Sequence, residues 1–429
     1  MNKLHVKYLI VGGGAAGAGA ADAIRALDRQ GEVLLVAQES SRPYRRGPLS
    51  GEALRERLPR AALFTHEPEW YVRNNVELRT GRRAAQLDVA RRGVLLDDGQ
   101  EVTFDKLLLA TGVTPKHLTI PGKDLPGLHY LRTYEDLERL RNAIDKAKAD
   151  GLKHLREDGG RGRAAVIGSG LLATEVAASL TALGVEVELL LKGDEPWARF
   201  AGHAAGTWVG RSLEKQGVAV RPVSAPARID GDGRVQRVIL PDGTAVACDF
   251  AVAAIGAVAN RELLRGTPIA AERAILTDAH CRTSVDGIYA AGDCAAIFDP
   301  LFNKYRALEH FESSAATGAL AGRNMAGATE AYDQVNHYST EVFGAPVSVY
   351  GESRHVHHRL VRGAASADNG GASFVEIGLT GDDRVSQVVA VNYAGDETVL
   401  REMVRRRTNL AGKEEAVKDP AVALNSLLD

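Results

Sequence analysis

The stretch Val6-Lys7-Tyr8-Leu9-Ile10-Val11-Gly12-Gly13-Gly14-Ala15-Ala16-Gly17 decides the fold. Its apolar first half predicts a short buried strand, and the alanine-rich residues 15–27 predict a helix. Gly12, Gly14 and Gly17 therefore lie at a strand-to-helix turn in GxGxxG spacing. Glycine at these places allows a tight turn, close approach of the backbone to a pyrophosphate and close packing of helix on strand. The stretch predicts a dinucleotide-binding unit.

A second strand and an acidic residue complete this unit. The apolar residues 33–36 predict the strand, which ends at Gln38-Glu39, and Glu39 lies 39 − 17 = 22 residues after Gly17. An acid in this place suits a ribose hydroxyl. A GxGxxG spacing alone is weak, because glycines also serve ordinary turns. Strand, helix, second strand and acid in one register favour a nucleotide site over a turn without a ligand.

The same pattern occurs a second time, 168 − 12 = 156 residues later. A strand over 164–167 leads into Gly168-Ser169-Gly170-Leu171-Leu172-Ala173, where Ala173 takes the third glycine place. A helix over 174–183 and a strand over 185–191 follow. Two dinucleotide units in one chain suggest two nucleotides whose reactive ends meet. This arrangement favours a flavin enzyme that a nicotinamide coenzyme reduces.

The second unit lacks the acid at the end of its second strand. Lys192 stands there, and Asp194 and Glu195 come slightly later. A lysine in this place can accept the 2′-phosphate of NADPH, or it can be an ordinary solvated residue at a strand end. The sequence therefore leaves the choice between NADH and NADPH open.

Two further strand ends support a flavin. Residues 107–109 predict a buried strand that leads into Ala110-Thr111-Gly112, where Thr and Gly let the chain turn beside a nucleotide. A second strand, over 287–291, leads into Gly292-Asp293. Gly292 permits close approach of the backbone, and Asp293 could accept a hydroxyl of the flavin's ribityl chain.

Together, these motifs resemble those of a known family. The motif order is similar to that of the FAD/NAD(P) oxidoreductases with two dinucleotide folds. Within them it resembles the branch of apoptosis-inducing factor, next to the ferredoxin reductases of aromatic-ring dioxygenases. The resemblance covers residues 6–330 well and rests on Pro43–Ser50, Thr80–Asp88, Ala110–Pro115 and Leu308–Phe311, with Gly318, Ala321, Gly322, Asn324 and Met325.

These motifs and the resemblance together predict the site residues. For FAD, the motifs supply Gly12, Gly14, Ala15, Ala16, Gly17, Gln38, Glu39, Ala110, Thr111, Gly112, Gly292 and Asp293, and the resemblance adds Arg46, Ala84, Arg132, His310 and Tyr338. For NAD(P)H, the predicted contacts are Gly168, Ser169, Gly170, Leu171, Leu172 and Lys192, and the resemblance adds Gly256 and Glu309. It also implies catalytic roles for Glu175 and His310.

The chain departs from the family pattern at the lysine that would pair with Glu175 and at the aromatic motif around Tyr338. The family lysine that would pair with Glu175 is replaced by Gly51. A buried acid without its cation is costly, so Glu175 should find another donor, become more solvated or stay protonated. Without the resemblance, an acid in the first turn of a helix would need no further explanation. The resemblance makes Tyr338 a candidate for the aromatic ring beside the flavin, and a core tyrosine is the alternative.

Composition and cysteines exclude several classes of protein. The net charge is 53 − 55 = −2, so no basic field indicates nucleic acid or an anionic membrane. Cys248, Cys281 and Cys294 form no CxxC, and the disulfide reductases' cysteine pair is absent, so electrons should leave the flavin for an external acceptor. His355 and His357 share a face of a predicted strand over 349–360, but a polar strand face is favoured and no metal is predicted.

The sequence thus predicts an α/β protein with two Rossmann-like domains and a C-terminal α+β domain. We expect an FAD-binding domain of 1–128 with 250–330 and an NAD(P)-binding domain of 129–249. A flavin-shielding or dimerisation domain of 331–429 should end in a helix from Asp419-Pro420. The charged insertion 135–163 should be a solvated helix and a Gly/Arg-rich loop, with no chemistry assigned.

We expect an FAD-dependent NAD(P)H oxidoreductase that passes electrons to a quinone, a small iron–sulfur protein or a similar acceptor. The alternative is a slow redox-responsive NAD(H)-binding signalling protein, which the loss of the lysine at Gly51 favours. No apolar stretch reaches the roughly 20 residues of a membrane span, and no signal sequence is evident, so a cytoplasmic protein is expected. The resemblance implies a homodimer.

Overall fold

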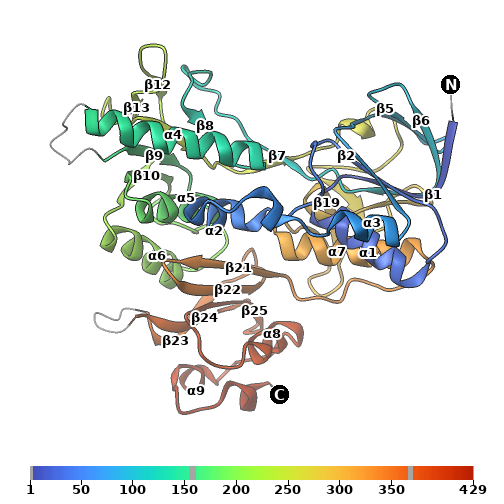
Figure 1. Cartoon of the computed structure of the whole chain (residues 1–429). Coiled ribbons are helices and arrows are strands. Elements are labelled where there is room, and N and C mark those ends of the chain that lie inside the picture. Colours follow the sequence, from blue (N-terminus) through green and yellow to red (C-terminus); the bar gives the residue numbers. More distant parts are fainter. Residues whose placement is uncertain (1–2, 154–160, 366–370, 429) are drawn as a thin grey trace. The chain divides into compact units, whose positions relative to one another are not determined.

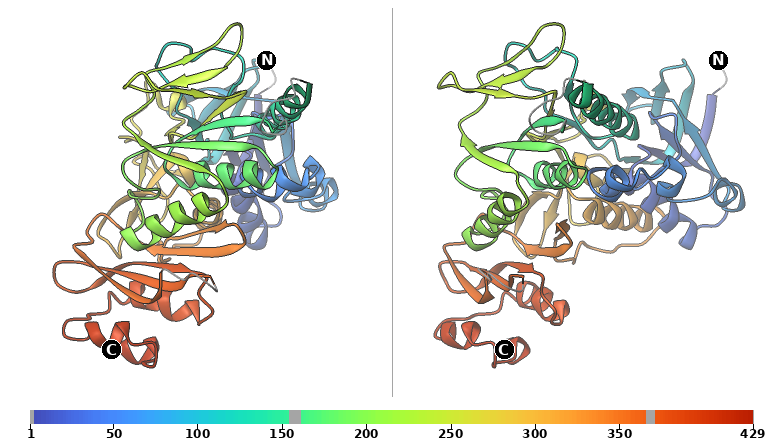
Figure 2. Two further views of the ribbon diagram at one scale, coloured as in Figure 1. Left: turned by 90° about the vertical axis from the view of Figure 1, so that its left-hand side faces the viewer. Right: turned by 60° about the vertical axis from the view of Figure 1, so that its left-hand side comes forward.

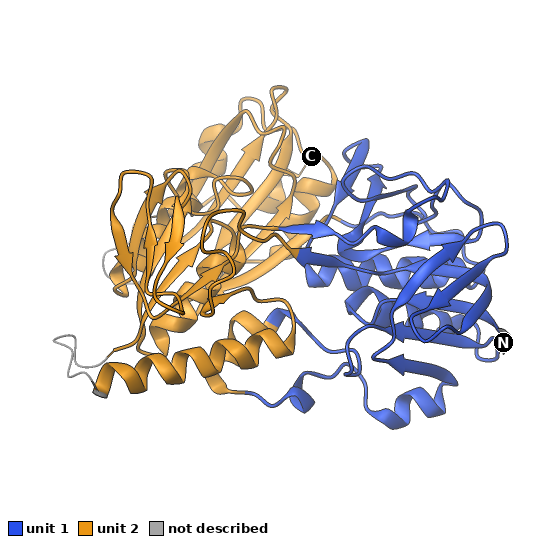
Figure 3. Cartoon of the chain, turned by 90° about the horizontal axis from the view of Figure 1, so that it is seen from above, with its two compact units in different colours: residues 1–47, 58–114, 257–334 blue, residues 48–57, 115–256, 335–429 orange. Residues whose placement is uncertain are grey.

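The structure is a computed structural model that describes residues 3–153, 161–365 and 371–428. The chain forms two compact units, which Figure 3 colours separately. Unit 1 comprises residues 1–47, 58–114 and 257–334, and unit 2 comprises residues 48–57, 115–256 and 335–429.

Unit 1 is built on a seven-stranded sheet. Six strands follow the order β3-β2-β1-β6-β5-β4, and β18 also pairs with β6. Their bounds are β1 (Lys3–Val11), β2 (Val33–Ala37), β3 (Val76–Thr80), β4 (Ala84–Asp88), β5 (Gly93–Leu96), β6 (Glu101–Leu109) and β18 (Ile288–Ala290). In β1, Ile10 packs into one buried cluster and Leu9 into another. The strand is therefore buried on both faces, which explains its continuous apolar run.

Helix α1 (Ala15–Leu27), as the sequence predicted, lies beside α7 (Phe311–Met325) (Figure 1). A Cβ atom at Gly318 of α7 would lie 2.1 Å from the carbonyl oxygen of Ala16, so only glycine allows this approach. The unit also contains the short helix α3 (Pro68–Arg73). Strand β7 (Val113–Pro115) pairs with β16 (Ala257–Ala259). A small separate sheet consists of β17 (Ile275–Thr277), β19 (Ala295–Asp299) and β20 (Lys304–Ala307).

Unit 2 contains a five-stranded parallel sheet in the order β11-β10-β9-β15-β8. Its strands are β8 (Leu128–His129), β9 (Arg163–Ile167), β10 (Glu186–Lys192), β11 (Ala219–Val223) and β15 (Phe250–Ala253). The helices are α2 (Glu52–Glu56), α4 (Tyr134–Lys153), α5 (Leu171–Ala182) and α6 (His203–Lys215), and β12 (Arg228–Asp230), β13 (Arg237–Ile239) and β14 (Ala245–Ala247) form a small antiparallel sheet.

An antiparallel sheet ends unit 2, in the order β21-β22-β25-β24-β23 (orange to red in Figure 2). It consists of β21 (His337–Val342), β22 (Ala345–Gly351), β23 (His358–Ala364), β24 (Ser373–Leu379) and β25 (Val385–Val391), followed by α8 (Glu397–Arg405) and α9 (Glu414–Lys418). Buried Glu376 of β24 accepts hydrogen bonds from the backbone N–H groups of Ala204 and Ala205, at 3.4 and 3.2 Å, and so caps α6.

Two local predictions were wrong. Asp419 ends α9 instead of starting a helix, and its backbone N–H bonds to Glu415. The segment 352–357 connects β22 to β23, so His355 and His357 do not share a strand face. The described part of the chain holds no group of three or more His, Cys, Asp and Glu residues that could bind a metal.

The predicted charged helix is present as α4, but one of its faces is buried, with Leu137, Leu140 and Ile144 at most 2% exposed. The first residues of the predicted loop, 159 and 160, lie outside the described residues. The predicted domain breaks at 128/129, 249/250 and 330/331 differ from the unit changes at 114/115, 256/257 and 334/335. The division by cofactor stays a prediction.

Candidate functional site

The first glycine loop is shaped by the protein's own backbone. The N–H group of Gly12 donates to the carbonyl of Val36 at 2.8 Å, which ties the loop to β2. Gly12 has φ +127°, and a Cβ there would lie 2.0 Å from the oxygen of Ala110. A Cβ at Gly17 would lie 1.9 Å from the oxygen of Gly12. The first and third glycines are therefore required by packing of the turn itself.

The second glycine loop repeats this construction in unit 2. Gly168 donates its N–H to the carbonyl of Leu190 on β10 at 2.9 Å and has φ +150°. A Cβ at Gly168 would lie 2.3 Å from the oxygen of Ala254. The side chain of Ala173 fits in the third place and is fully buried. Both predicted strand-to-helix turns are thus present.

The middle glycine of each loop has a different role. Gly14 and Gly170 have φ of −89° and −94°, which other residues adopt, and they are the N-caps of α1 and α5. A Cβ at either would meet no protein atom within 4 Å, and no side chain caps either helix. Packing therefore does not explain these glycines. The free space and the open N–H groups at the helix start fit a pyrophosphate, as FAD and NAD(P)H would each bring.

Glu39, the predicted ribose acid of unit 1, takes part in a polar cluster. Tyr44 donates its hydroxyl to Glu39 Oε2 at 2.6 Å, Arg46 forms an ion pair with Glu39, and Arg46 Nη1 lies 3.0 Å from the Tyr44 hydroxyl. Gln38 is exposed beside them. The cluster holds Arg46 beside Glu39, just after β2. The flavin contact that the resemblance implies for Arg46 stays a prediction.

The two predicted strand ends of unit 1 are held by side chains. Thr111 Oγ1 donates to the carbonyl of Asn260 at 2.8 Å, and Asn260 Nδ2 donates back to the carbonyl of Thr111 at 2.9 Å. Gly112 has φ +66° and accepts from the N–H of Asn260. Asp293 Oδ1 accepts a hydrogen bond from Ser314 on α7 at 2.6 Å. The ATG and GD turns are thus each held by hydrogen bonds to side chains or backbone distant in sequence.

Glu175, on α5, accepts hydrogen bonds from two hydroxyl groups. Ser50 Oγ donates to Glu175 Oε2 and Thr340 Oγ1 donates to Glu175 Oε1, each at 2.5 Å. Burial raises the pKa of Glu175, whereas both hydroxyl donors and the charge of Arg55 lower it. Arg55 Nη1, from α2, also lies 3.4 Å from Ser179 Oγ, which is on α5 like Glu175. Hydroxyls and a nearby guanidinium therefore replace the lysine that is absent at Gly51.

The remaining predicted residues divide between the units. Gly12, Ala15, Ala16, Gly17, Ala84, Ala110, Gly292, Glu309 and His310 belong to unit 1, and Arg132, Leu171, Leu172, Lys192, Gly256 and Tyr338 belong to unit 2. Arg132 and Tyr338, predicted for FAD, thus fall outside the unit of the FAD loop. Glu309, predicted for NAD(P)H, falls outside the unit of its loop. His310 is the N-cap of α7. These assignments stay predictions.

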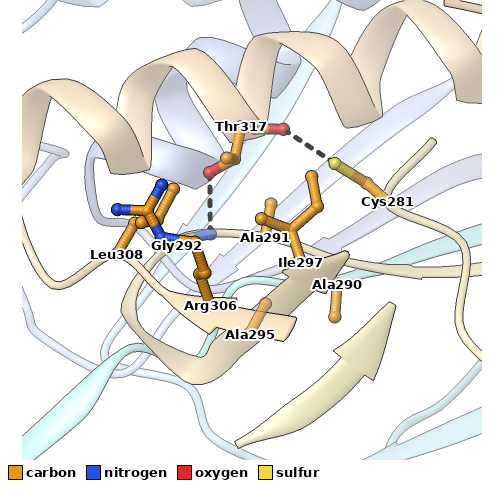
Figure 4. Close-up of a pocket in the computed structure, with 9 residues that line it drawn as sticks. All are labelled: Cys281, Ala290, Ala291, Gly292, Ala295, Ile297, Arg306, Leu308 and Thr317. Atoms are coloured by element: carbon orange, nitrogen blue, oxygen red, sulfur yellow. Dashed lines mark hydrogen bonds between the residues drawn. The ribbon is translucent and has the colours of Figure 1, made fainter. Parts of the chain in front are cut away.

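The cysteines are free and buried. Burial raises the pKa of Cys248 to about 12 and also raises the pKa values of Cys281 and Cys294. A thiol that resists ionisation is a poor nucleophile for disulfide exchange. Cys281 lines a pocket of about 10 Å³ beside Gly292 and Thr317 (Figure 4). That volume holds about one water molecule.

Sequence reasoning missed Trp197 and Asn260. Trp197 is fully buried with φ +63°, its N–H donates to the carbonyl of Ser169 at 2.8 Å, and its Nε1 donates to Thr174 Oγ1 at 3.0 Å. A bulky residue with positive φ is uncommon and marks a constrained site. No motif signals either residue, because both act through contacts distant in sequence.

Comparison with known proteins places these features in a family. The model of a family described as pyridine nucleotide-disulphide oxidoreductase matches residues 6–328. The biphenyl dioxygenase system ferredoxin–NAD(+) reductase component of Paraburkholderia xenovorans (strain LB400) is 33% identical over 98% of this chain and 97% of its own length. A rubredoxin–NAD(+) reductase of Pseudomonas putida is 29% identical over 74% of this chain and 80% of its own length.

Solved structures show the same fold. A ferredoxin reductase from Rhodopseudomonas palustris gives a TM-score of 0.87 at 23% identity and covers 99% of this chain and 100% of its own. Putidaredoxin reductase, solved in a covalent complex with putidaredoxin, gives a TM-score of 0.88 at 24% identity, over 99% and 98% of the two chains. The predicted arrangement of two dinucleotide folds and a C-terminal domain is confirmed.

Proposed function

The chain belongs to the pyridine nucleotide-disulphide oxidoreductase family, and we propose that it delivers electrons to a small iron–sulfur protein of ferredoxin type. It is an FAD-dependent oxidoreductase that draws electrons from a nicotinamide coenzyme. The observation that carries the proposed acceptor is the near full-length similarity to a ferredoxin–NAD(+) reductase component, which includes the C-terminal sheet.

The chain's own residues bind and orient the two nucleotides. FAD, when bound, supplies the chemistry by taking a hydride from the coenzyme and releasing electrons to the acceptor. Gly14 and Gly170 leave space for the two pyrophosphates at helix starts. We assign the flavin's hydroxyl and phosphate contacts to Glu39, Arg46 and Asp293, as the sequence predicted.

Glu175 is assigned a place at the reacting end of the coenzyme. Its two hydroxyl donors fix both carboxylate oxygens, so the side chain has one orientation. A fixed carboxylate beside a nicotinamide would orient the ring's amide and favour its positive charge after hydride loss. This assignment, like that of His310, Arg132, Tyr338 and Glu309, rests on the family resemblance.

Electrons leave without a protein disulfide. The described structure pairs none of the three cysteines, and each thiol is buried. The relatives named above are reductases, which favours turnover over the slow signalling alternative. Sparse reduced cysteines support a cytoplasmic location, and a homodimer remains part of the proposal. No helix among the described residues is both long and apolar enough to span a bilayer.

The acceptor is tested by reconstitution. The FAD-loaded chain is mixed with NADH, a purified [2Fe–2S] ferredoxin and cytochrome c, whose reduction reports electrons that have passed through the ferredoxin. We expect cytochrome c reduction that depends on ferredoxin concentration and saturates. Reduction of a soluble quinone but not of ferredoxin would refute the proposed acceptor and leave the oxidoreductase itself intact.

A further inference from the structure

The two dinucleotide units can be aligned residue by residue from their strand register. Val11 pairs with Val36 in unit 1, and Ile167 pairs with Leu190 in unit 2, immediately before the respective glycine loops. Two residues after these partners stand Gln38 and Lys192. Lys192 is the last residue of β10, and it stands at the strand end where a dinucleotide unit places its ribose-recognising side chain, one residue before the place that Glu39 has in unit 1.

The backbone around Lys192 is held against the phosphate loop. Ser169 Oγ donates to the carbonyl of Lys192 at 3.4 Å. Five residues later, Trp197 donates hydrogen bonds to Ser169 of the glycine loop and to Thr174 of α5, the helix that follows it. The segment between them is anchored at both ends, so the Lys192 side chain starts from a fixed point beside the predicted nucleotide.

Glu195, one of the two carboxylates that follow the strand end, does not replace the missing acid. Gly193, at the place that Glu39 has in unit 1, carries no side chain. Glu195 accepts from Thr207 at 3.2 Å and lies 2.8 Å from His203 Nδ1, both on α6. A Cβ at Gly206 would lie 2.9 Å from the Glu195 carboxyl carbon. The lack of a side chain at Gly206 therefore allows Glu195 to pack against α6. The Glu195 carboxylate is thus bound to α6 and does not lie free at the strand end.

Two charged side chains remain at the strand end, Lys192 and Asp194. Both are exposed, and neither forms a hydrogen bond or ion pair with the described residues. Asp194 follows the turn at Gly193, which has φ +101°, whereas Lys192 belongs to the strand. An ammonium group at this place attracts a phosphate dianion, and a ribose hydroxyl gains little from it.

We propose that Lys192 forms a subsite for the 2′-phosphate of NADPH, so that this chain uses NADPH as well as NADH. The inference rests on the proposed binding of a nicotinamide coenzyme at the second glycine loop. It departs from the names of the relatives, which specify NAD(+). The recognised chemistry is a phosphate monoester on the 2′-oxygen of an adenosine.

Direct binding to the FAD-loaded full chain tests the proposal. Calorimetry measures the affinities of adenosine 2′,5′-bisphosphate and 5′-AMP, which differ only in the 2′-phosphate. The wild-type protein should bind the bisphosphate more tightly. Lys192→Ala should lower that affinity about tenfold, the effect of one lost hydrogen bond to a charged group, and change the 5′-AMP affinity less than about twofold. Lys215→Ala, an exposed lysine at the far end of α6, is the matched control.

Three results would overturn the proposal. The wild-type protein could bind the bisphosphate no more tightly than 5′-AMP. Lys192→Ala could lower both affinities equally, or Asp194→Asn instead of Lys192→Ala could set their ratio. Failure of the proposed function would be seen separately, as a chain that binds these nucleotides but passes no electrons from NADH to ferredoxin.

Discussion

Removal of the Ser50 hydroxyl tests how the carboxylate of Glu175 is stabilised. Ser50 and Thr340 each donate one hydrogen bond at 2.5 Å to a different oxygen of this partly buried side chain. A hydrogen bond to a charged group contributes about 1.5–3 kcal/mol, against about 0.5–1.5 kcal/mol for a neutral pair. Ser50→Ala should therefore cost up to about 3 kcal/mol when Glu175 is ionised and about half as much when it is protonated.

The sign of the pH dependence follows from the raised pKa. Burial holds the pKa of Glu175 above its usual 4.5, so the folded state binds the proton more tightly than the unfolded chain does. The ionised carboxylate thus costs stability as the pH rises above 4.5. Ser50→Ala removes a donor to that ionised form and raises the pKa further. Its penalty should therefore be larger at pH 8 than at pH 5.

The assay is the melting temperature of the FAD-loaded protein at the two pH values. Ser50→Ala and Thr340→Val should each lower it more at pH 8 than at pH 5. Thr181→Val is the matched control, because Thr181 Oγ1 donates only to the carbonyl of Ala177 in its own helix. Equal penalties at both pH values, or a Ser50→Ala penalty no larger than that of the control, would refute the account of Glu175.

Further predictions concern the glycine loops, an ion pair and the thiols. Gly14→Ala should weaken FAD retention about 10-fold or more while leaving the apoprotein folded, whereas Gly17→Ala should prevent folding of unit 1, and both are checked by flavin content and melting temperature. Gly170→Ala should weaken nicotinamide binding without loss of FAD, and equal loss of both would contradict separate loops. Asp299→Ala should cost about 3–5 kcal/mol in thermal unfolding, because it removes the carboxylate from an ion pair with Arg306 whose side chains are at most 5% exposed. The three cysteines should react with a thiol reagent at pH 8 only after unfolding, and a variant with all three replaced by alanine should still pass electrons.

The glycine loops could be predicted from sequence because their chemistry is local. The first helix, α1, has the predicted bounds, and α5 begins three residues before its predicted start, Thr174. Strand, turn and helix follow one another directly over residues 3–27, so one continuous stretch of sequence contains the whole signal. The sequence could not separate Gly14 from Gly12 and Gly17, since only the folded structure shows at which glycine a Cβ would meet protein atoms.

The partners of Glu175 could not be predicted, because they come from distant parts of the chain. Ser50 and Thr340 lie more than a hundred residues from Glu175, on either side of it in sequence. The sequence indicated only that the acid needed a new donor. The wrong strand through His355 has a different cause, since short polar segments between strands carry no strong periodicity. The predicted helix start at Asp419 is wrong because no apolar stripe of helical spacing follows its capping pattern.

The most direct test of the central claim is anaerobic reduction of the bound flavin. The purified chain, loaded with FAD, is mixed with one equivalent of NADH, and the flavin absorbance is followed until it is constant. We predict that the absorbance is lost and that oxidised ferredoxin restores it. A chain that binds no FAD, or that keeps its flavin oxidised with NADH and NADPH alike, would contradict the claim.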